Sequence, residues 1–196
     1  MFVQVITGRV ADPELYARQG DAWRTDVKPG AAGYLGSTSG VTPDGRAIVV
    51  VRFESEEAAR ANSDRPEQGA WWAETSKAFD GAPEFHDCTE VDLVGGGASD
   101  QAGFVQVMQG RAKDEAEARR VMNELEPELR SERPDVIGIV SAWHGDGGFT
   151  QTVYFTSEEA AREGERSMST SEAAAALMAL LDGEITFYDL PDPIHD

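Results

Sequence analysis

The side chains that could do chemistry in this 196-residue chain are few, and the first of them is His86. It lies in a segment that we predict as a strand, next to Asp87, and strand alternation places it on the same face as Cys88 and Glu90. An imidazole in such a position can act as a general base near neutral pH. A strand histidine that is only hydrogen-bonded or solvated is the alternative, so the catalytic role is a hypothesis.

Trp71 and Trp72 are the next candidates because adjacent indoles could stack on a flat ligand. They lie on a predicted helix, where successive side chains point about 100° apart. Both rings therefore cannot face one pocket squarely. Packing in the core or in an interface is the alternative for the pair.

Arg9 and Arg111 end the first strand of each half of the chain at matching positions. A guanidinium there could bind an anionic ligand. The alternative is a residue at the rim of the sheet that pairs with one of the many carboxylates.

An internal repeat defines the elements that position these residues. Shifting the chain by 102 residues superimposes Phe53–Arg60 on the nearly identical Phe155–Arg162. The same shift superimposes Phe2–Val5 on Phe104–Val107, and across 59 aligned positions 20 are identical without a gap. Chance does not produce such a match, so the protein consists of two tandem copies of one module.

The first module is predicted to contain the order β-α-β-β-α-β. Asp12 and Pro13 begin the first helix, Pro43–Gly45 turns a hairpin, and Ser55 caps the second helix, which breaks near Pro66. The predicted strands are 2–7, 33–41, 47–53 and 85–94, with helices over 13–27, 55–61 and 70–79. Four such strands form one antiparallel sheet with the helices on one face, and the other face needs a cover.

The glycine-rich stretch after this module marks the boundary between the two copies. The predicted organisation is a first module over 1–94, a linker over 95–102, a second module over 103–190 and an exposed tail over 191–196. The fold class is therefore α+β, with two tandem ferredoxin-like modules.

Composition limits the partners. The net charge is −19, from 36 acidic and 17 basic residues, and such a surface repels nucleic acids and anionic lipids. The N-terminal segment is predicted to be a strand rather than a leader, and the apolar helical run 173–181 is shorter than a membrane span. One cysteine, Cys88, permits a reducing compartment. We expect a cytoplasmic protein without nucleic-acid or membrane partners.

The element order, the Phe2–Val5 strand, the Phe-x-Ser-Glu-Glu-Ala-Ala-Arg junction at Phe53–Arg60 and an aromatic second helix resemble the antibiotic-biosynthesis-monooxygenase group of dimeric α/β-barrel proteins. The resemblance covers both modules. It implies that two ferredoxin-like modules pack sheet to sheet and close an intramolecular barrel, which would cover the bare faces. The expected state is a monomer with an internal pseudo-dimer, and further self-association is left open.

In several enzymes of that group the pocket lies between the sheet and its helices. The resemblance thus implies a site in the first module, whose aromatic residues the second module lacks, since Val136 replaces Tyr34. The substrate-binding candidates are Tyr34, Trp71, Trp72 and Arg9, with His86 as catalytic base. Known activities in the group include cofactor-free oxygenation of phenols and quinols, and no cofactor or metal is expected here.

Haem degradation, another activity of the group, is not expected because Gly8 and Gly110 replace the asparagine that precedes the arginine in those members. The three histidines and one cysteine also lack the spacing of a structural zinc site. Two functions remain. The first is a monooxygenase acting on a small aromatic substrate in the first module, and the second is a non-catalytic small-molecule-binding or stress-related accessory protein.

Overall fold

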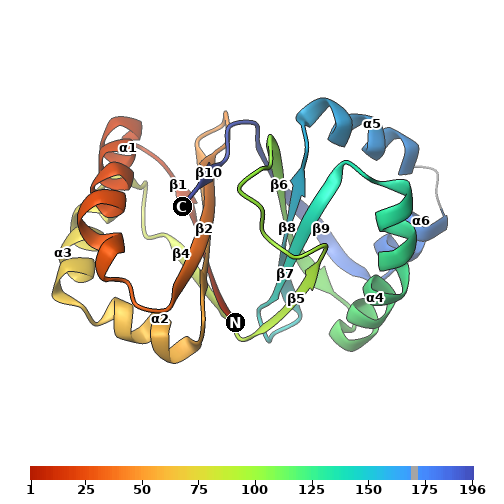
Figure 1. Cartoon of the computed structure of the whole chain (residues 1–196), viewed down its shortest axis with the longest axis horizontal. Helices are drawn as coiled ribbons and strands as arrows, with labels where there is room; N and C mark the ends of the chain where they lie inside the picture. The colour runs from red at the N-terminus through yellow and green to blue at the C-terminus, as the bar shows by residue number, and fades with distance from the viewer. Residues whose placement is uncertain (169–171) are drawn as a thin grey trace. The chain divides into compact units, whose positions relative to one another are not determined.

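The computed structural model describes residues 1–168 and 172–196 and contains two compact units (Figure 1). Unit 1 comprises Met1–Thr89 together with Ile194–Asp196, and unit 2 comprises Glu90–Pro193. Each unit is a five-stranded antiparallel sheet with helices, so the α+β class is confirmed.

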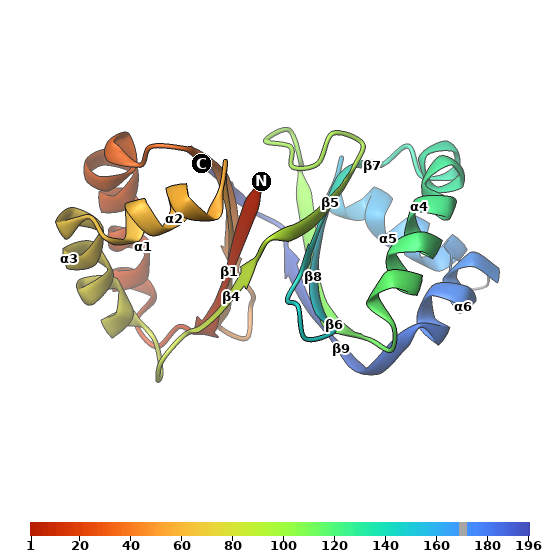
Figure 2. The same ribbon diagram turned by 90° about the horizontal axis from the view of Figure 1, so that it is seen from below.

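Unit 1 has the strand order β10-β2-β3-β1-β4, in which the last four strands have the ferredoxin-like arrangement. Its helices lie on one face of the sheet (Figures 1 and 2). Its strands are β1 (Phe2–Arg9), β2 (Tyr34–Val41), β3 (Arg46–Phe53), β4 (Glu84–Cys88) and β10 (Ile194–His195). Its helices are α1 (Pro13–Ala22), the π-helical turn η1 (Trp23–Val27), the 3-10 turns η2 (Lys28–Gly30) and η3 (Ser76–Ala78), α2 (Glu56–Ser63) and α3 (Pro66–Thr75).

Local sequence explains where these helices begin. The side chain of Asp12 accepts a hydrogen bond from the backbone N–H of Leu15 at 2.9 Å, and Ser55 accepts one from Ala58 at 3.2 Å. Pro66 begins α3, where its missing N–H costs no helical hydrogen bond. The predicted break between two helices near Pro66 is therefore confirmed.

Unit 2 repeats this arrangement with the order β5-β7-β8-β6-β9. Its strands are β5 (Glu90–Val94), β6 (Phe104–Ala112), β7 (Val136–Trp143), β8 (Gly148–Phe155) and β9 (Leu181–Leu190). Its helices are α4 (Glu115–Glu132), α5 (Glu158–Met168) and α6 (Glu172–Ala179). Two tandem ferredoxin-like modules are confirmed, while their packing sheet to sheet stays a prediction.

The predicted single strand over 85–94 is two strands. β4 pairs with β1, where Cys88 lies opposite Val3, whereas β5 pairs with β7, where Val94 lies opposite Ile139. The chain thus leaves unit 1 after Thr89 and not after Val94. Both segments have strand-like sequence, so local pattern gives no sign of the crossing.

The predicted exposed tail over 191–196 is also corrected, because its last residues return to unit 1. Ile194 lies opposite Ser39 and His195 opposite Thr38. The backbone of Asp196 exchanges two hydrogen bonds with that of Ser37, at 2.9 and 3.1 Å. The free edge of β2 supplies the partner groups that this short segment needs.

β5 and β10 are equivalent additions to the two sheets. Residues 92–93 align with β10 under the 102-residue shift, and the strands that receive them, β2 and β7, align with each other. Each receiving strand has a register shift that ends at a glycine, Gly36 or Gly138. A side chain at these glycines would press on nearby backbone, since a Cβ would lie 3.1 Å from the Asp196 carbonyl oxygen in unit 1 and would overlap the Gly97 carbonyl oxygen in unit 2.

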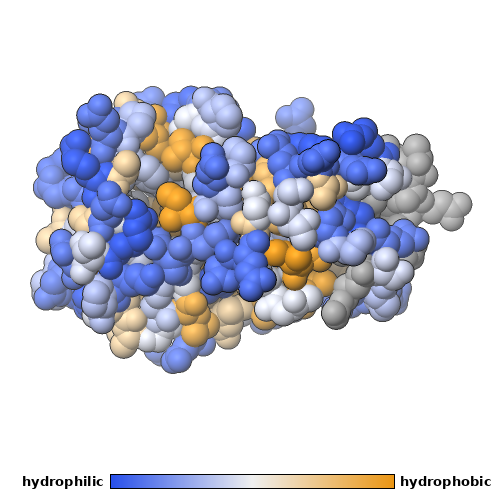
Figure 3. Space-filling view, turned by 45° about the horizontal axis from the view of Figure 1, so that its top comes forward, coloured by the Kyte–Doolittle hydropathy of each residue, from blue (hydrophilic) through white to orange (hydrophobic). Residues whose placement is uncertain are grey.

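Hydrophilic side chains cover most of the face shown in Figure 3, as the net charge of −19 suggests. Exposed large apolar residues come from several different strands and helices, for example Leu35, Leu93 and Met178. Single exposed apolar residues are normal on a protein surface. Among the described residues, no helix is both long and apolar enough to cross a membrane.

Gly138→Ala should lower the denaturation midpoint and cost about 2 kcal/mol or more, because the new methyl group would displace the backbone at Gly97. Gly69→Ala is the matched control: Gly69 lies in α3 and a Cβ there meets no atom within 4 Å. That change should stabilise by up to about 1 kcal/mol. Urea unfolding followed by circular dichroism measures both, and equal midpoints would contradict the close approach at Gly138.

Candidate functional site

The two faces of the sheet in unit 1 are buried to different extents. Val3, Val5 and Val50 point away from the helices and are at most 1% exposed. Ile6 and Val49 occupy the helix-facing side of the same central strands and are only half-buried. Solvent therefore reaches the helix-facing side of these central strands more than it reaches the opposite side.

The helices above this face are also loosely covered. None of the residues in α1 is buried, and Thr75 is the buried residue of α3. We call the region between these helices and the sheet the helix-side layer of unit 1. Its floor contains half-buried apolar side chains, which is typical of a surface that a ligand could cover.

A continuous series of ring contacts runs through this layer, which we call the aromatic chain. Neighbouring ring centroids are 5.1–6.3 Å apart, within the usual range for aromatic pairs. Its members are Tyr16, Trp23, Tyr34, Phe53, Trp71, Trp72, Phe79 and Phe85. Rings from β2, β3, β4 and the helices thereby meet around one apolar floor.

The indole N–H groups of Trp71 and Trp23 form hydrogen bonds between the helices of unit 1. The Trp71 N–H donates to the backbone carbonyl of Gln19 in α1 at 2.8 Å, and the Trp23 N–H donates to the Gln68 side chain in α3 at 3.2 Å. Their polar groups are therefore used in packing. The sequence alternative of a packing role is the better description of Trp71.

Trp72 differs from its neighbour. Its ring contacts those of Trp71, Phe79 and Phe85, but its N–H donates to no residue within the described part of the chain. The side chain is half-buried. Trp72 thus offers both a ring face and an unused donor at the layer.

Tyr16 and Tyr34 are the titratable groups of the aromatic chain, and desolvation of each phenol raises its pKa from 10.0 to about 12. Both phenols are neutral at physiological pH, as an ordinary phenol is, and each can donate a hydrogen bond. The Tyr34 hydroxyl donates to the backbone carbonyl of Asp196 at 3.2 Å. The Tyr16 hydroxyl donates to none of the described residues.

The structure brings together three of the five predicted site residues, Tyr34, Trp71 and Trp72, but separates His86 from them. His86 lies opposite Val5 in the β1–β4 register, on the face that points away from the helices. Its neighbour Phe85 is the residue that faces Trp72, at 5.3 Å between centroids. The placement does not support His86 as a base in the helix-side layer.

Arg9 is also outside the layer. Its guanidinium donates to the backbone carbonyl of Asp44 at 2.7 Å, so it holds the hairpin turn between β2 and β3. Arg111 contacts Asp146 at the equivalent turn of unit 2. The matching arginines thus fit a structural role at the rim.

Sequence reasoning omitted Tyr16 and Phe85 from the site. Tyr16 and Trp23 are seven residues apart, a spacing that places them on one helix face, so a signal for Tyr16 was present. For Phe85 the decisive fact is which face of the sheet the helices cover. That fact depends on tertiary packing and has no local signal.

The corresponding layer in unit 2 is built differently. Trp143, the last residue of β7, is 3% exposed, and its N–H donates to Asp92 at 2.8 Å. Arg119 also pairs with Asp92, at 2.8 Å, and lies over the Trp143 ring. These contacts tie β5 to α4 and β7, so the tryptophan serves packing. His144 is hydrogen-bonded to Thr150 at 2.9 Å.

Within residues 1–168 and 172–196, no group of three or more His, Cys, Asp or Glu side chains is arranged to hold a metal ion. The buried Cys88 thiol has a pKa raised to about 12, chiefly by burial, so it is protonated at neutral pH.

Comparison with known proteins gives matches only at the level of structure. No protein-family model matches the sequence, and no curated protein does. A solved structure named "putative monooxygenase" from Lactobacillus acidophilus NCFM has a TM-score of 0.71 at 14% identity, covering 96% of this chain and 92% of its own. A protein with the same name from Fusobacterium nucleatum gives 0.74 at 7%, covering 96% and 90%.

A third solved structure, an anthrone oxidase-like protein, has a TM-score of 0.66 at 12% identity and covers 99% of this chain and 92% of its own. At such identities the similarity shows the fold. The chain therefore shares its ferredoxin-like fold with these proteins, and the fold that the sequence resemblance implied is confirmed.

The two raised tyrosine pKa values predict a specific titration. At pH 11, a phenol with a pKa of about 12 is about one-tenth ionised, whereas an ordinary one is about nine-tenths ionised. Signals assigned by Tyr16→Phe and Tyr34→Phe in ¹³C-tyrosine NMR should therefore still be those of neutral phenols. Because the pKa of each phenol is higher in the folded protein, the neutral phenols contribute to the free energy of unfolding. This contribution is complete below pH 10 and is lost as the pH rises towards 12. Half-ionisation of either signal near pH 10 would contradict the buried layer.

Proposed function

We propose that the helix-side layer of unit 1 binds a small planar aromatic molecule, and that the protein is a monooxygenase-like enzyme acting on a phenol or quinol there. The observation that carries this proposal is the half-buried apolar floor beneath the helices, lined by the aromatic chain. Ile6 and Val49 lie in central strands yet keep access to solvent. The names of proteins with the same fold are consistent with this chemistry.

An aromatic ligand fits this surface for two physical reasons. Covering the apolar floor would contribute about 25 cal/mol per Å² of surface removed from water. Ring contacts with Trp72 and Phe85 would add about 0.5–1.5 kcal/mol for each well-oriented pair. A compact charged metabolite would gain neither the burial of apolar surface nor the ring contacts.

The proposed reaction needs only the substrate and O₂. A phenol with a free ring position would lose one C–H hydrogen and its O–H hydrogen. One oxygen atom of O₂ would form the new carbonyl of a quinone, and the other would leave as water with those two hydrogens. The electrons come from the substrate, which is why a ring that is readily oxidised is required.

The groups in the layer suit this chemistry as donors rather than as bases. The Tyr16 hydroxyl and the Trp72 N–H are the two donors of the aromatic chain with no acceptor among the described residues. Aimed at a substrate oxygen, such donors would stabilise the negative charge that develops on it. His86 has no part in the proposed site.

One observation favours the second candidate function, a binding protein without catalysis. Both phenols of the layer are held neutral, with pKa values of about 12, and the N–H groups of Trp23 and Trp71 hold the helices. A layer equipped only with donors could bind an aromatic molecule without promoting its oxidation. Binding of quinols without oxygen uptake would identify this function.

Trp72→Ala should weaken the binding of a naphthol or anthrone panel about tenfold, because a stacked ring and its apolar surface are lost. Trp72→Phe should restore most of that affinity. His86→Ala is the control and should leave binding and oxygen uptake unchanged. Fluorescence titration and an oxygen electrode measure the two quantities. Equal loss in the His86 and Trp72 variants would contradict the placement of the site.

A further inference from the structure

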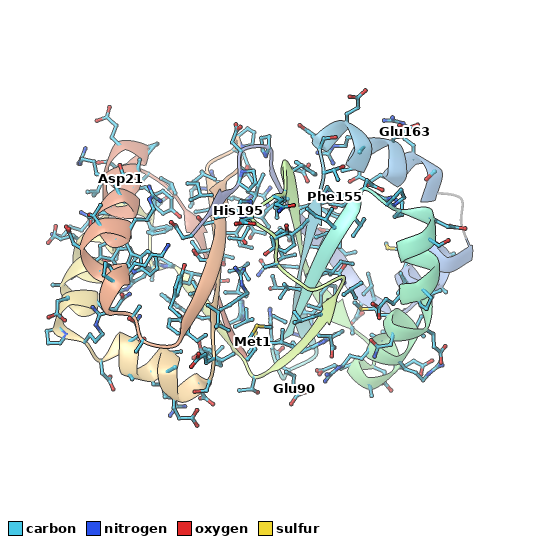
Figure 4. All side chains as sticks on the ribbon, in the orientation of Figure 1. Met1, Asp21, Glu90, Phe155, Glu163 and His195 are labelled. Carbon is cyan, nitrogen blue, oxygen red and sulfur yellow. The ribbon has the colours of Figure 1, made fainter. Side chains whose placement is uncertain are left out.

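The segment Ile194–Asp196 lies at one end of the proposed site. It pairs with β2 at the edge of the unit 1 sheet, and His195 is seen there in Figure 4. Asp196 accepts the Tyr34 hydroxyl on its backbone carbonyl at 3.2 Å. Tyr34 in turn belongs to the aromatic chain, where its ring is 5.1 Å from that of Trp23. The end of the segment is thus bonded directly to the layer.

The Asp196 side chain makes a second set of contacts, with the helical side of the layer. Its carboxylate lies 3.6 Å from the Arg24 guanidinium and 3.8 Å from the Lys28 ammonium. Lys28 also lies over the Tyr34 ring, 5.8 Å from its centroid. The carboxylate is 10% exposed. One residue therefore connects the edge of β2 with η1 and η2.

The part of the helix that it contacts is irregular. Arg24 lies in the π-helical turn η1, between α1 and the 3-10 turn η2. Such turns are rare and frequently occur at functional sites. A link between β2 and this turn spans the layer at the point where the regular helix has ended.

The segment is held weakly. It makes two register pairs with β2, whereas β5 makes five with β7. Beyond these pairs it is held by three hydrogen bonds to Asp196, two with the Ser37 backbone and one from Tyr34, and by two ion pairs that are long, at 3.6 and 3.8 Å, and whose basic partners are about one-third exposed. Arg24 also pairs with Asp21, so it keeps a carboxylate partner when Asp196 leaves. Detachment therefore costs little compared with unfolding.

We propose that residues 194–196 form a reversible strap over the β2–η1 end of the helix-side layer, fastened by Asp196. When the strap is docked it closes this end, and when Asp196 leaves Arg24 and Lys28 the aromatic layer opens to an entering ligand. This inference rests on the proposed function, because it concerns access to the same layer. It requires no change in the β2–β3 hairpin.

Hydrogen exchange tests detachment without any ligand. The Ser37 N–H donates to the Asp196 carbonyl, so it should exchange by local opening, faster than the N–H groups that pair β1 with β3. Asp196→Asn should accelerate Ser37 exchange several-fold, and so should 0.5 M salt in the wild type. Asp192→Asn is the matched control because Asp192 is exposed and has no ion pair among the described residues. Exchange of Ser37 only at the rate of global unfolding would overturn the strap.

Stopped-flow binding of the neutral polycyclic dye Nile red tests gating. A neutral probe is used so that salt acts on the strap and not on the dye. Asp196→Asn and deletion of residues 194–196 should raise the association rate several-fold and remove its dependence on salt, while Asp192→Asn should behave as wild type. Equal rates in all variants would overturn gating and leave the binding site intact. Absence of dye binding in every variant would overturn both the binding site and the gating, even if the exchange experiment shows that the segment detaches.

Discussion

The two strands that receive an added edge strand, β2 and β7, each depend on a glycine beside neighbouring backbone. At Gly138 a Cβ would overlap the carbonyl oxygen of Gly97, which follows β5. At Gly36 a Cβ would lie 2.6 Å from the Arg52 guanidinium and 3.1 Å from the Asp196 carbonyl oxygen, and the φ of +140° there favours glycine. The bulges at these glycines shift the register of β2 against β3 and of β7 against β8. Once the added strands are seated, their carboxylates reach the helical side of each unit, Asp92 at Arg119 and Asp196 at Arg24.

The two units have the same architecture, but different side chains pack between the helices and the sheet. In unit 2 the helix-facing side contains two apolar clusters, one around Phe104 and Phe155 and the other around Trp143 and Phe149. In unit 1 the buried cluster around Phe2 and Phe53 is smaller, and the aromatic chain makes up much of the rest of the helix-side layer. The two units thus fill equivalent layers with different side chains.

Much of the fold could be predicted from the sequence because the repeat, the caps and the turns are local signals. The order of strands and helices in both units followed from Phe53–Arg60, its copy and the prolines and glycines between elements. The crossing after Thr89 could not be predicted in this way, since β4 and β5 are both strand-like and which sheet each one joins depends on distant partners. The tail was a different case. The 102-residue shift aligns residues 192–196 with 90–94, so the repeat itself contains a signal that the tail matches a strand-forming segment.

The site was predicted in part for a similar reason. Aromatic residues near the second helix were recognised by type, and Tyr34, Trp71 and Trp72 do lie together. Alternation correctly placed His86 on the face of Cys88, whereas Glu90, predicted on the same face, belongs to β5 in the sheet of unit 2. Alternation cannot show which face of the sheet the helices cover. The helices cover the face opposite His86, so its imidazole lies away from the aromatic chain.

The joining of two modules in one chain has a consequence for how such a protein can evolve. When identical subunits exchange strands, every substitution occurs twice, so a change that improves one cavity also alters its twin. Here each copy of the module is encoded separately, so a substitution changes only one of them. Strand pairing within one chain also does not depend on protein concentration. Trp23 and Tyr34 could therefore be retained in one half while leucine and valine occupy the same places in the other. Covalent linkage thus lets the two halves carry different side chains in equivalent layers.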